Sequence, residues 1–152
     1  MKFISGKSID NALTKTQRVY LAGNLALPQE IDNIDSQLEI GLSRYQHYTE
    51  ELPHYHASNN EYNYVIKGTM KLYVFKERKE YEFHGGDLYL ATPGLGYVTK
   101  ILKGTEIIFV KSPGGNDKHV LQITPGIKKW LENWDAEMIP DWEGEQPNDL
   151  KE

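Results

Sequence analysis

The sequence predicts an all-β domain built as an antiparallel barrel or double-sheet jelly roll. Between residues 37 and 110 the chain divides into short segments of strand-like composition, separated by turns that contain Gly or Pro. No helical pattern interrupts this region, which argues against an α/β fold because parallel strands need long crossover connections. A chain of 152 residues can bury one substantial core and leaves no room for a second domain.

The expected strands follow one another at short intervals. In chain order they cover residues 38–48, 54–56, 61–66, 70–76, 81–83, 87–91, 96–102 and 106–110. Hairpin-like connections of this length favour antiparallel pairing. We therefore place the core barrel at residues 36–112.

The segments on either side of the barrel have a different character. Residues 1–35 form an N-terminal extension, with a short helix expected near residues 8–16 and an apolar stretch at 18–23. Within residues 113–139, an apolar stripe at helical spacing predicts an amphipathic C-terminal helix that covers the barrel. The stripe consists of Ile127, Trp130, Leu131, Trp134 and Met138. Residues 140–152 form an acidic tail without periodicity, which we expect to be loosely ordered.

The composition excludes several classes of function. The chain has no cysteine, so disulfides, thiolate metal sites and cysteine nucleophiles are absent. Seventeen Lys and Arg residues stand against 22 Asp and Glu, a net charge of −5, and no basic stripe suits a nucleic-acid partner. No run approaches membrane-spanning length and the first residues lack a signal-peptide pattern, so we expect a cytoplasmic protein without a membrane partner.

The most informative local pattern is His54-Tyr55-His56 followed by Glu61. Residues two apart on a strand share a face, so both imidazoles point the same way. The segment 57–60 contains small and turn-forming residues, which lets the chain reverse and bring the carboxylate to both rings. Two His and one carboxylate, with coordination positions left free, suit Fe, Mn, Ni or Zn. The sequence therefore predicts a divalent transition metal at His54, His56 and Glu61.

This spacing, His-x-His, four residues, Glu61, six residues and Gly68, resembles the first conserved motif of the cupin superfamily. The second cupin motif resembles residues 86–97, where Tyr97 replaces the His that is the fourth metal ligand in most metal-binding cupins. The resemblance implies an antiparallel double-stranded β-helix, the RmlC-like jelly-roll barrel, with the C-terminal helix beside it. It also implies a homodimer and an N-terminal extension that packs on the barrel or on a partner subunit.

Tyr97 places a phenol where an imidazole would be expected. A phenol has a solution pKa of about 10, which a bound cation could lower, so Tyr97 is a candidate weak ligand and a candidate proton donor. Both interpretations place Tyr97 in the pocket. A third, that the ring only fills space in a degenerate site, remains open.

Three further side chains are candidates for substrate binding. Alternation from Glu61 puts Asn63 on the same inward face, and the strand of the second motif contributes Thr99. The first barrel strand leaves two possibilities. An inward Arg44 would supply a guanidinium for a carboxylate or phosphate, whereas an inward His47 would supply another imidazole.

Three functions are compatible with these residues. The leading hypothesis is a metal-dependent cupin, such as an isomerase or oxygenase, that acts on or binds a sugar or a keto or hydroxy acid. The second is a metal-independent isomerase or epimerase, resembling the cupins that modify nucleotide-linked sugars, with His54 or His56 as base and Tyr97 as acid. The third is a non-enzymatic protein that binds a small molecule in the barrel.

Overall fold

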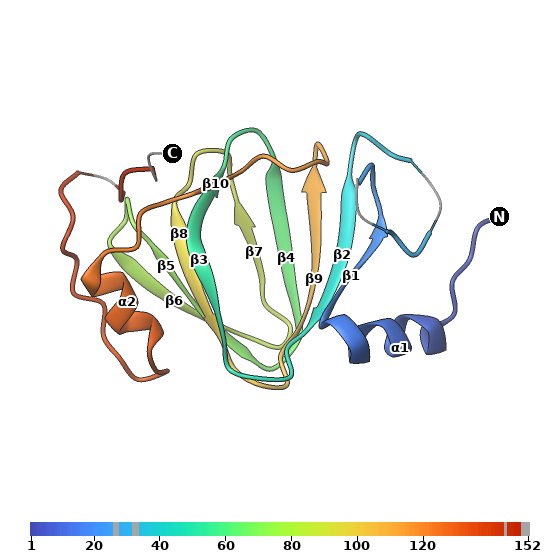
Figure 1. The fold of residues 1–152 in the computed structure, drawn as a ribbon, viewed down its shortest axis with the longest axis horizontal. Helices are drawn as coiled ribbons and strands as arrows, with labels where there is room; N and C mark the ends of the chain where they lie inside the picture. Colours follow the sequence, from blue (N-terminus) through green and yellow to red (C-terminus); the bar gives the residue numbers. More distant parts are fainter. Residues whose placement is uncertain (26–27, 32–33, 145, 150–152) are drawn as a thin grey trace.

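Two antiparallel sheets face each other and enclose the barrel interior (Figure 1). The computed structural model describes residues 1–25, 28–31, 34–144 and 146–149. The first sheet runs in the order β1 (Arg18–Ala22), β2 (Glu39–Arg44), β9 (Glu106–Ser112), β4 (Asn60–Lys67) and β7 (Leu88–Ala91). The second runs in the order β10 (Lys118–Val120), β3 (Thr49–His56), β8 (Tyr97–Ile101), β5 (Thr69–Val74) and β6 (Lys79–His84). The predicted all-β jelly roll is confirmed.

The apolar core has two parts, one inside the barrel and one outside it. Inside, two clusters fill the space between the sheets; they contain Tyr45, Val65, Met70, Leu72, Val74, Ala91, Tyr97, Ile101 and Ile107. Outside, the second sheet packs against α2 (Pro125–Leu131) through Tyr73, Phe75, Val98, Leu121, Ile127, Trp130 and Leu131. All five residues of β8 are buried, because the inner face of this strand packs in the barrel core and its outer face packs in the core beneath α2.

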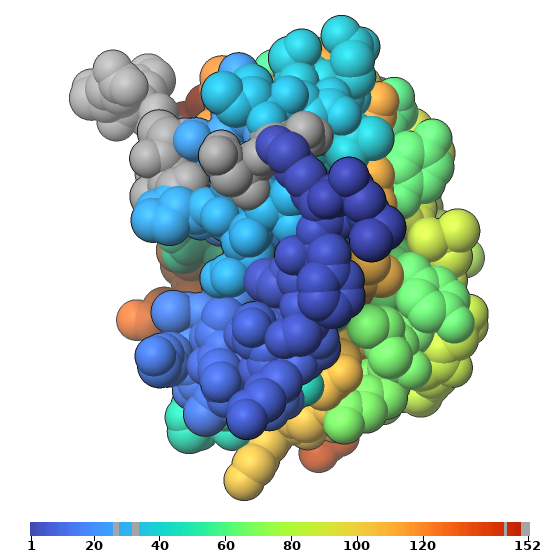
Figure 2. Space-filling model, turned by 90° about the vertical axis from the view of Figure 1, so that its right-hand side faces the viewer, coloured from blue at the N-terminus to red at the C-terminus, as the bar shows by residue number. Residues whose placement is uncertain are grey.

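The N-terminal segment closes one end of the first sheet, where α1 (Gly6–Thr16) packs against β1 (Figure 2). Ser5 caps α1 by accepting a hydrogen bond from the amide of Ser8 at 3.2 Å, and Leu13 is the buried contact of the helix. The helix ends at Gln17, whose φ of 60° breaks the helical path. Residues 26–27 and 32–33 of the predicted extension lie outside the described residues. Neither of the two described helices is long and apolar enough to span a membrane.

The boundaries of the first two barrel strands differ from the prediction. The expected strand at 38–48 is β2, which ends at Arg44, and β3 then begins at Thr49 instead of His54. The ladder between β3 and β8 pairs Glu51 with Thr99 and His54 with Tyr97. Between these two pairs β3 advances by three residues and β8 by two, so β3 contains one extra residue. This β-bulge accommodates Pro53, which has no N–H to give to a ladder.

The C-terminal segment differs more. The predicted helical stripe continues to Met138, but α2 ends at Leu131, where the carbonyls of Trp130, Asn133 and Ala136 turn toward the ammonium of Lys100. The acidic tail is not loose over its described residues. The ring of Trp142 packs on Phe75 with centroids 5.2 Å apart, and Asp149 accepts a hydrogen bond from Tyr55 at 3.2 Å. Residues 145 and 150–152 of the tail lie outside the described residues.

The motif glycine, Gly68, makes the turn between β4 and β5. Its φ is +90°, and a Cβ at this position would collide with Thr105, whose hydroxyl accepts the amide hydrogen bond of Thr69 at 3.0 Å. A side chain is therefore excluded on two grounds, the left-handed backbone and the close approach. This tight turn returns the chain from β4 in the first sheet to β5 in the second.

Candidate functional site

A cavity of about 170 Å³ lies in the barrel interior between the two sheets. Its polar wall consists of Arg18, Ser43, Tyr45, Glu51, His54, His56, Glu61, Asn63, Tyr89, Tyr97, Lys111, Asn116 and Lys118. Five of these were predicted from the sequence as site residues: His54, His56, Glu61, Asn63 and Tyr97. Residues from both sheets therefore converge on one polar chamber inside an apolar barrel.

His54 holds a neutral imidazole aimed at Tyr97. Its Nδ1 lies 2.7 Å from the carbonyl oxygen of Leu52, which can only accept, so Nδ1 carries the proton. The hydroxyl of Tyr97 then donates to Nε2 at 3.2 Å. Burial and the positive charge of Lys118 lower the pKa of His54 to about 4. At neutral pH the unprotonated Nε2 therefore faces the cavity, where it accepts the hydrogen bond of Tyr97.

Tyr97 is a protonated phenol in this arrangement. Burial raises its pKa well above 10, and the negative charge of Glu61 raises it further. The hydroxyl therefore keeps its proton and donates a hydrogen bond to Nε2 of His54.

His56 is held between two carboxylates. Its Nε2 lies 3.1 Å from Glu61 and its Nδ1 lies 2.7 Å from Asp117. Burial opposes a positive charge here, but the hydrogen bonds to these two carboxylates outweigh it and raise the pKa of His56 above its usual value. Both ring nitrogens then donate, and the arrangement favours the imidazolium.

Asp117 was not among the predicted site residues. Its second oxygen accepts hydrogen bonds from the amides of Ser58 and Asn59 at 2.7 and 2.8 Å, which fix the carboxylate in place. These donors, together with His56, outweigh burial and lower the pKa of Asp117 to about 2. Asp117 lies 61 residues beyond His56 in the chain, and only the pairing of β10 with β3 brings the two together.

Glu61 is ionised and positioned by neighbours on its own sheet. It accepts a hydrogen bond from the amide nitrogen of Asn63 at 3.0 Å, so the predicted polar partner on this face contacts the carboxylate. Burial would raise its pKa, but the hydrogen bonds from His56 and Asn63 prevail and lower the pKa to about 2. In the β4–β9 ladder Lys111 lies directly opposite Glu61 and adds positive charge.

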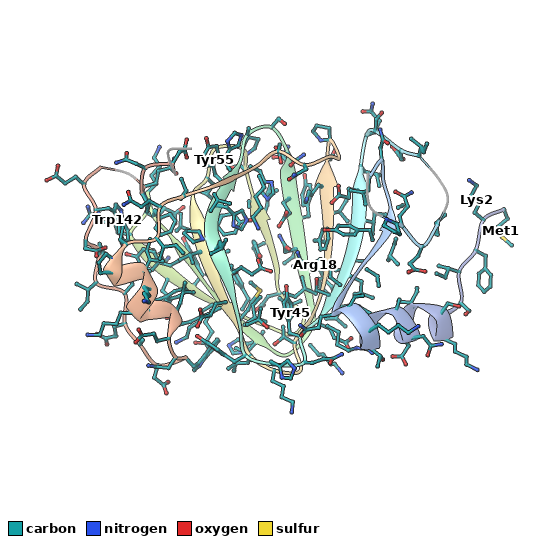
Figure 3. The ribbon with its side chains drawn as sticks, in the orientation of Figure 1. Met1, Lys2, Arg18, Tyr45, Tyr55 and Trp142 are labelled. Carbon is teal, nitrogen blue, oxygen red and sulfur yellow. The ribbon has the colours of Figure 1, made fainter. Side chains whose placement is uncertain are left out.

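A second polar cluster, which the sequence did not reveal, occupies another part of the cavity wall. Arg18 reaches the space between the sheets from β1, close to Tyr45 (Figure 3). Its guanidinium donates to Glu51 at 2.8 Å, to Tyr45 at 3.0 Å and to Ser43 at 2.9 Å. Burial favours the neutral acid at Glu51, but the charge of Arg18 outweighs it and lowers the pKa of that carboxyl.

Two predicted substrate contacts do not line the cavity. Arg44 lies on the opposite face of β2 and pairs with Glu106 and Asp10 at 2.8 and 2.6 Å. The inward face of this strand is the one that carries Ser43, and Tyr45 continues it, while His47 is exposed beyond the strand end. The strand face assigned to His47 in the second alternative is therefore the inward one, but His47 itself supplies no imidazole to the cavity.

Thr99 is buried but lies behind the cavity wall. Its hydroxyl donates to Glu51 at 3.3 Å, and the two residues are directly opposite in the β3–β8 ladder. Thr99 thus orients Glu51 and does not line the cavity.

The shifted pKa values predict acid sensitivity of the metal-free protein. His54 has a lower pKa folded, about 4, than in an unfolded chain, about 6.5, so the unfolded state binds more protons in this window. The free energy of unfolding should therefore fall by on the order of 2–3 kcal/mol as pH drops from about 6.5 to 4. Asp117 and Glu61 should extend the loss toward pH 2.

Urea unfolding with a chelator present, repeated across this pH range, measures the effect. His54→Gln should flatten the curve between pH 6.5 and 4, whereas the exposed His47→Gln should leave it unchanged. Parallel curves for the wild type and His54→Gln would contradict the assignment.

Comparison with known proteins identifies the fold. No protein-family model matches the chain, and no curated protein matches it in sequence. Among solved structures, a Klebsiella pneumoniae protein with a double-stranded β-helix domain aligns with 59% of this chain and 78% of its own, with 16% identity and a TM-score of 0.51. The nucleoside dehydratase Pac13 of Streptomyces aligns with 60% of this chain and 73% of its own, with 13% identity and a TM-score of 0.52.

A variant of oxalate decarboxylase from Bacillus subtilis is also similar. It aligns with 57% of this chain and 25% of its own, with 20% identity and a TM-score of 0.50. These similarities, together with the two facing antiparallel sheets, define a double-stranded β-helix protein. The chain therefore has the fold of the cupin superfamily, as its motifs predicted.

Proposed function

We propose that this chain is a small-molecule cupin whose cavity holds a divalent transition metal at His54, His56 and Glu61. The cavity would bind, and act on, a small polar molecule such as a sugar or a keto or hydroxy acid. The observation that carries the proposal is the convergence of these three donors and Tyr97 on one cavity. The Pac13 dehydratase, crystallised with uridine, and oxalate decarboxylase are proteins of the same fold whose names denote activities on small molecules.

The donor set fits a transition metal in kind. Nδ1 of each imidazole is tied to an acceptor at 2.7 Å, the carbonyl of Leu52 for His54 and the carboxylate of Asp117 for His56. Metal-binding histidines usually have such a partner, which fixes the ring and directs Nε2 at the cation. The ligands would be Nε2 of His54, Nε2 of His56 and the carboxylate of Glu61.

Two pairs of neighbouring donors also have a spacing compatible with coordination. Two ligands about 2.1 Å from a cation and at right angles to each other lie about 3.0 Å apart. Nε2 of His56 lies 3.1 Å from Glu61, and Nε2 of His54 lies 3.2 Å from the hydroxyl of Tyr97. In the present arrangement these atoms bond to each other, and across the described residues no three His, Cys, Asp or Glu side chains are grouped as a metal site. Metal binding would replace these hydrogen bonds with coordination.

The roles of the surrounding residues follow from their contacts. A bound metal would supply Lewis acidity toward a carbonyl or hydroxyl of the substrate. Tyr97 holds a proton on the cavity side and is the candidate acid, while His54 is the group beside it that can accept one. Asn63 and Asp117 keep Glu61 and His56 in place.

A second candidate, metal-independent acid–base catalysis, is favoured by a separate observation. Two hydrogen-bonded groups line the cavity without any cation: Tyr97 donates to His54, and His56 bridges Glu61 and Asp117. The neutral imidazole of His54 could remove a proton next to a carbonyl, and the phenol of Tyr97 could return one. In this case the pair between His56 and Glu61 positions the neighbouring groups.

Metal content separates the two candidates. Protein purified without chelator or added metal is analysed by elemental mass spectrometry, before and after reconstitution with Fe, Mn, Ni or Zn salts. We expect close to one metal per chain in the wild type and almost none in His54→Ala/His56→Ala. His47→Ala, which changes an exposed imidazole outside the cavity, should bind as the wild type does.

Each outcome decides between the candidates. Stoichiometric metal that the double variant loses and His47→Ala retains supports the metal site. A wild type without metal even after reconstitution overturns it and favours acid–base chemistry by His54 and Tyr97. Equal metal in the wild type and the double variant would place the cation elsewhere and also overturn it.

A further inference from the structure

The charges that line the cavity are paired, with one exception. The pairs are Arg18–Glu51 at 2.8 Å, Lys111–Glu39 at 3.1 Å and His56–Glu61 at 3.1 Å. Lys118 also lines the cavity, but its ammonium group has no hydrogen bond or ion pair with any described residue. Among the described residues, Lys118 is therefore the one charged group of the lining without an ion-pair partner.

The fold directs Lys118 toward the candidate site. In the ladder between β10 and β3, Lys118 lies directly opposite His56, and opposed residues project from the same face of a sheet. The next pair along, His119 and Tyr55, projects to the other side, where the two rings stack with centroids 4.9 Å apart. Lys118 is exposed, so it stands where the cavity meets solvent.

The neighbours of Lys118 belong to the same site. Asp117 holds His56, and Asn116 is a further residue of the cavity wall. One short segment thus positions a candidate metal ligand and presents an amide and an ammonium to the cavity. Two carboxylates act electrostatically on Lys118, those of Glu51 and Glu61. Both already form ion pairs, Glu51 with Arg18 and Glu61 with His56.

We propose that Lys118 binds an anionic oxygen group, a carboxylate or a phosphate, of the molecule that enters the cavity. This inference rests on the proposed use of the barrel cavity as the small-molecule site. It narrows the candidate ligands from neutral sugars to small acids, because an acid gains a charge-assisted hydrogen bond and an ion pair with the ammonium that a neutral ligand lacks. The cavity of about 170 Å³ is smaller than the usual range of about 300–1,000 Å³ for drug-sized ligands, which favours a molecule of few carbons.

Glycerate, glycerol 3-phosphate and glycerol test this proposal, because they share a carbon skeleton and differ in charge. The full ¹⁵N-labelled chain is titrated with each at low salt, and binding is followed by NMR chemical shifts. We expect both acids, or one of them, to bind at least about tenfold more tightly than glycerol. The acid that binds more tightly identifies the anionic group.

Variants localise the effect to Lys118. Lys118→Gln should weaken acid binding by about tenfold and leave glycerol binding unchanged. Lys118→Arg, which keeps the charge, should retain most of the acid preference. Lys103→Gln is the matched control, because it removes an exposed lysine that lines a different surface depression.

Three results would overturn the proposal: glycerol binding as tightly as the acids, Lys118→Gln binding the acids as the wild type does, or no binding of any of the three compounds. Metal content measured on the same preparations reports separately on the proposed metal site. An acid preference that depends on Lys118 in protein without metal would support this inference while the metal proposal failed. If the wild type and Lys118→Gln both retain metal but the wild type shows no acid preference, the metal proposal would stand and this inference would fail.

Discussion

Replacing Asp117 with alanine is expected to lower the affinity for a divalent transition metal by about ten- to hundredfold. Asp117 is not a proposed ligand. It accepts the Nδ1 hydrogen bond of His56 at 2.7 Å, which directs Nε2 toward the cavity and makes the ring more basic. Without this carboxylate the ring can rotate or change tautomer, and Nε2 loses its fixed direction. Competition with a chromophoric chelator measures the affinity.

The same variant should also lower the pKa of His56, whether or not a metal binds. Hydrogen bonds to Glu61 and Asp117 raise this pKa against the effect of burial, so removing one of them should shift it downward. An NMR pH titration of the imidazole signals in metal-free protein measures the shift. This readout distinguishes a positioning role from general loss of structure.

Asp141→Ala provides the matched control for Asp117→Ala. Asp141 also accepts a backbone amide hydrogen bond, from Gly126 at 2.7 Å, but it does so beside α2 and away from the cavity. It should reduce stability without changing metal affinity or the pKa of His56. Equal metal loss in both variants, or an unchanged His56 in Asp117→Ala, would disprove the positioning role.

The candidate metal ligands could be predicted from the sequence because they are local. His54, His56 and Glu61 lie within eight residues, and strand alternation followed by a short turn is enough to bring them together. Asp117 could not be found in this way, since its contact with His56 depends on the pairing of β10 with β3. The polar segment that contains it had no strand-like pattern to suggest that pairing.

The second polar cluster, in which Arg18 pairs with Glu51, was not predicted because the backbone of β3 is irregular. Simple alternation from His54 places Leu52 on the inward face and Glu51 on the outward face. The bulge near Pro53 reverses this order, so that Glu51 faces the cavity and meets Arg18. Arg18 itself begins a largely apolar stretch in the N-terminal extension, and nothing local shows that this strand joins the barrel wall.

Eight of the ten described strands, β2 to β9, were predictable in order because each is bounded by Gly, Pro or polar turn residues. The length of the C-terminal helix was less predictable. Its apolar stripe predicts one helix continuing to Met138, and the buried cation that ends this helix belongs to β8, about 30 residues earlier in the chain. On sequence alone, Lys100 reads as an exposed residue of an edge or outer strand face.

Replacing Lys100 with methionine should lower the free energy of unfolding by about 3 kcal/mol or more. Its side chain is fully buried on the outer face of β8, and its Nζ donates to the carbonyls of Trp130, Asn133 and Ala136 at 3.0, 3.0 and 3.2 Å. The ammonium also lies 4.2 Å from the ring centre of Trp130. Methionine fills similar space but leaves three buried or partly buried carbonyls without this donor.

Urea unfolding of the two proteins at neutral pH measures the loss, and Lys71→Met supplies the comparison. Lys71 lies opposite Lys100 in the β5–β8 ladder but donates to one carbonyl, that of Trp134 at 3.1 Å. Its replacement should therefore cost less, about 1 kcal/mol. A Lys100→Met variant as stable as Lys71→Met would show that the carbonyls find other partners. The cavity lies on the other face of β8, so both variants should keep the metal content and acid binding of the wild type. The contacts that hold α2 on the barrel would then be independent of ligand binding in the cavity.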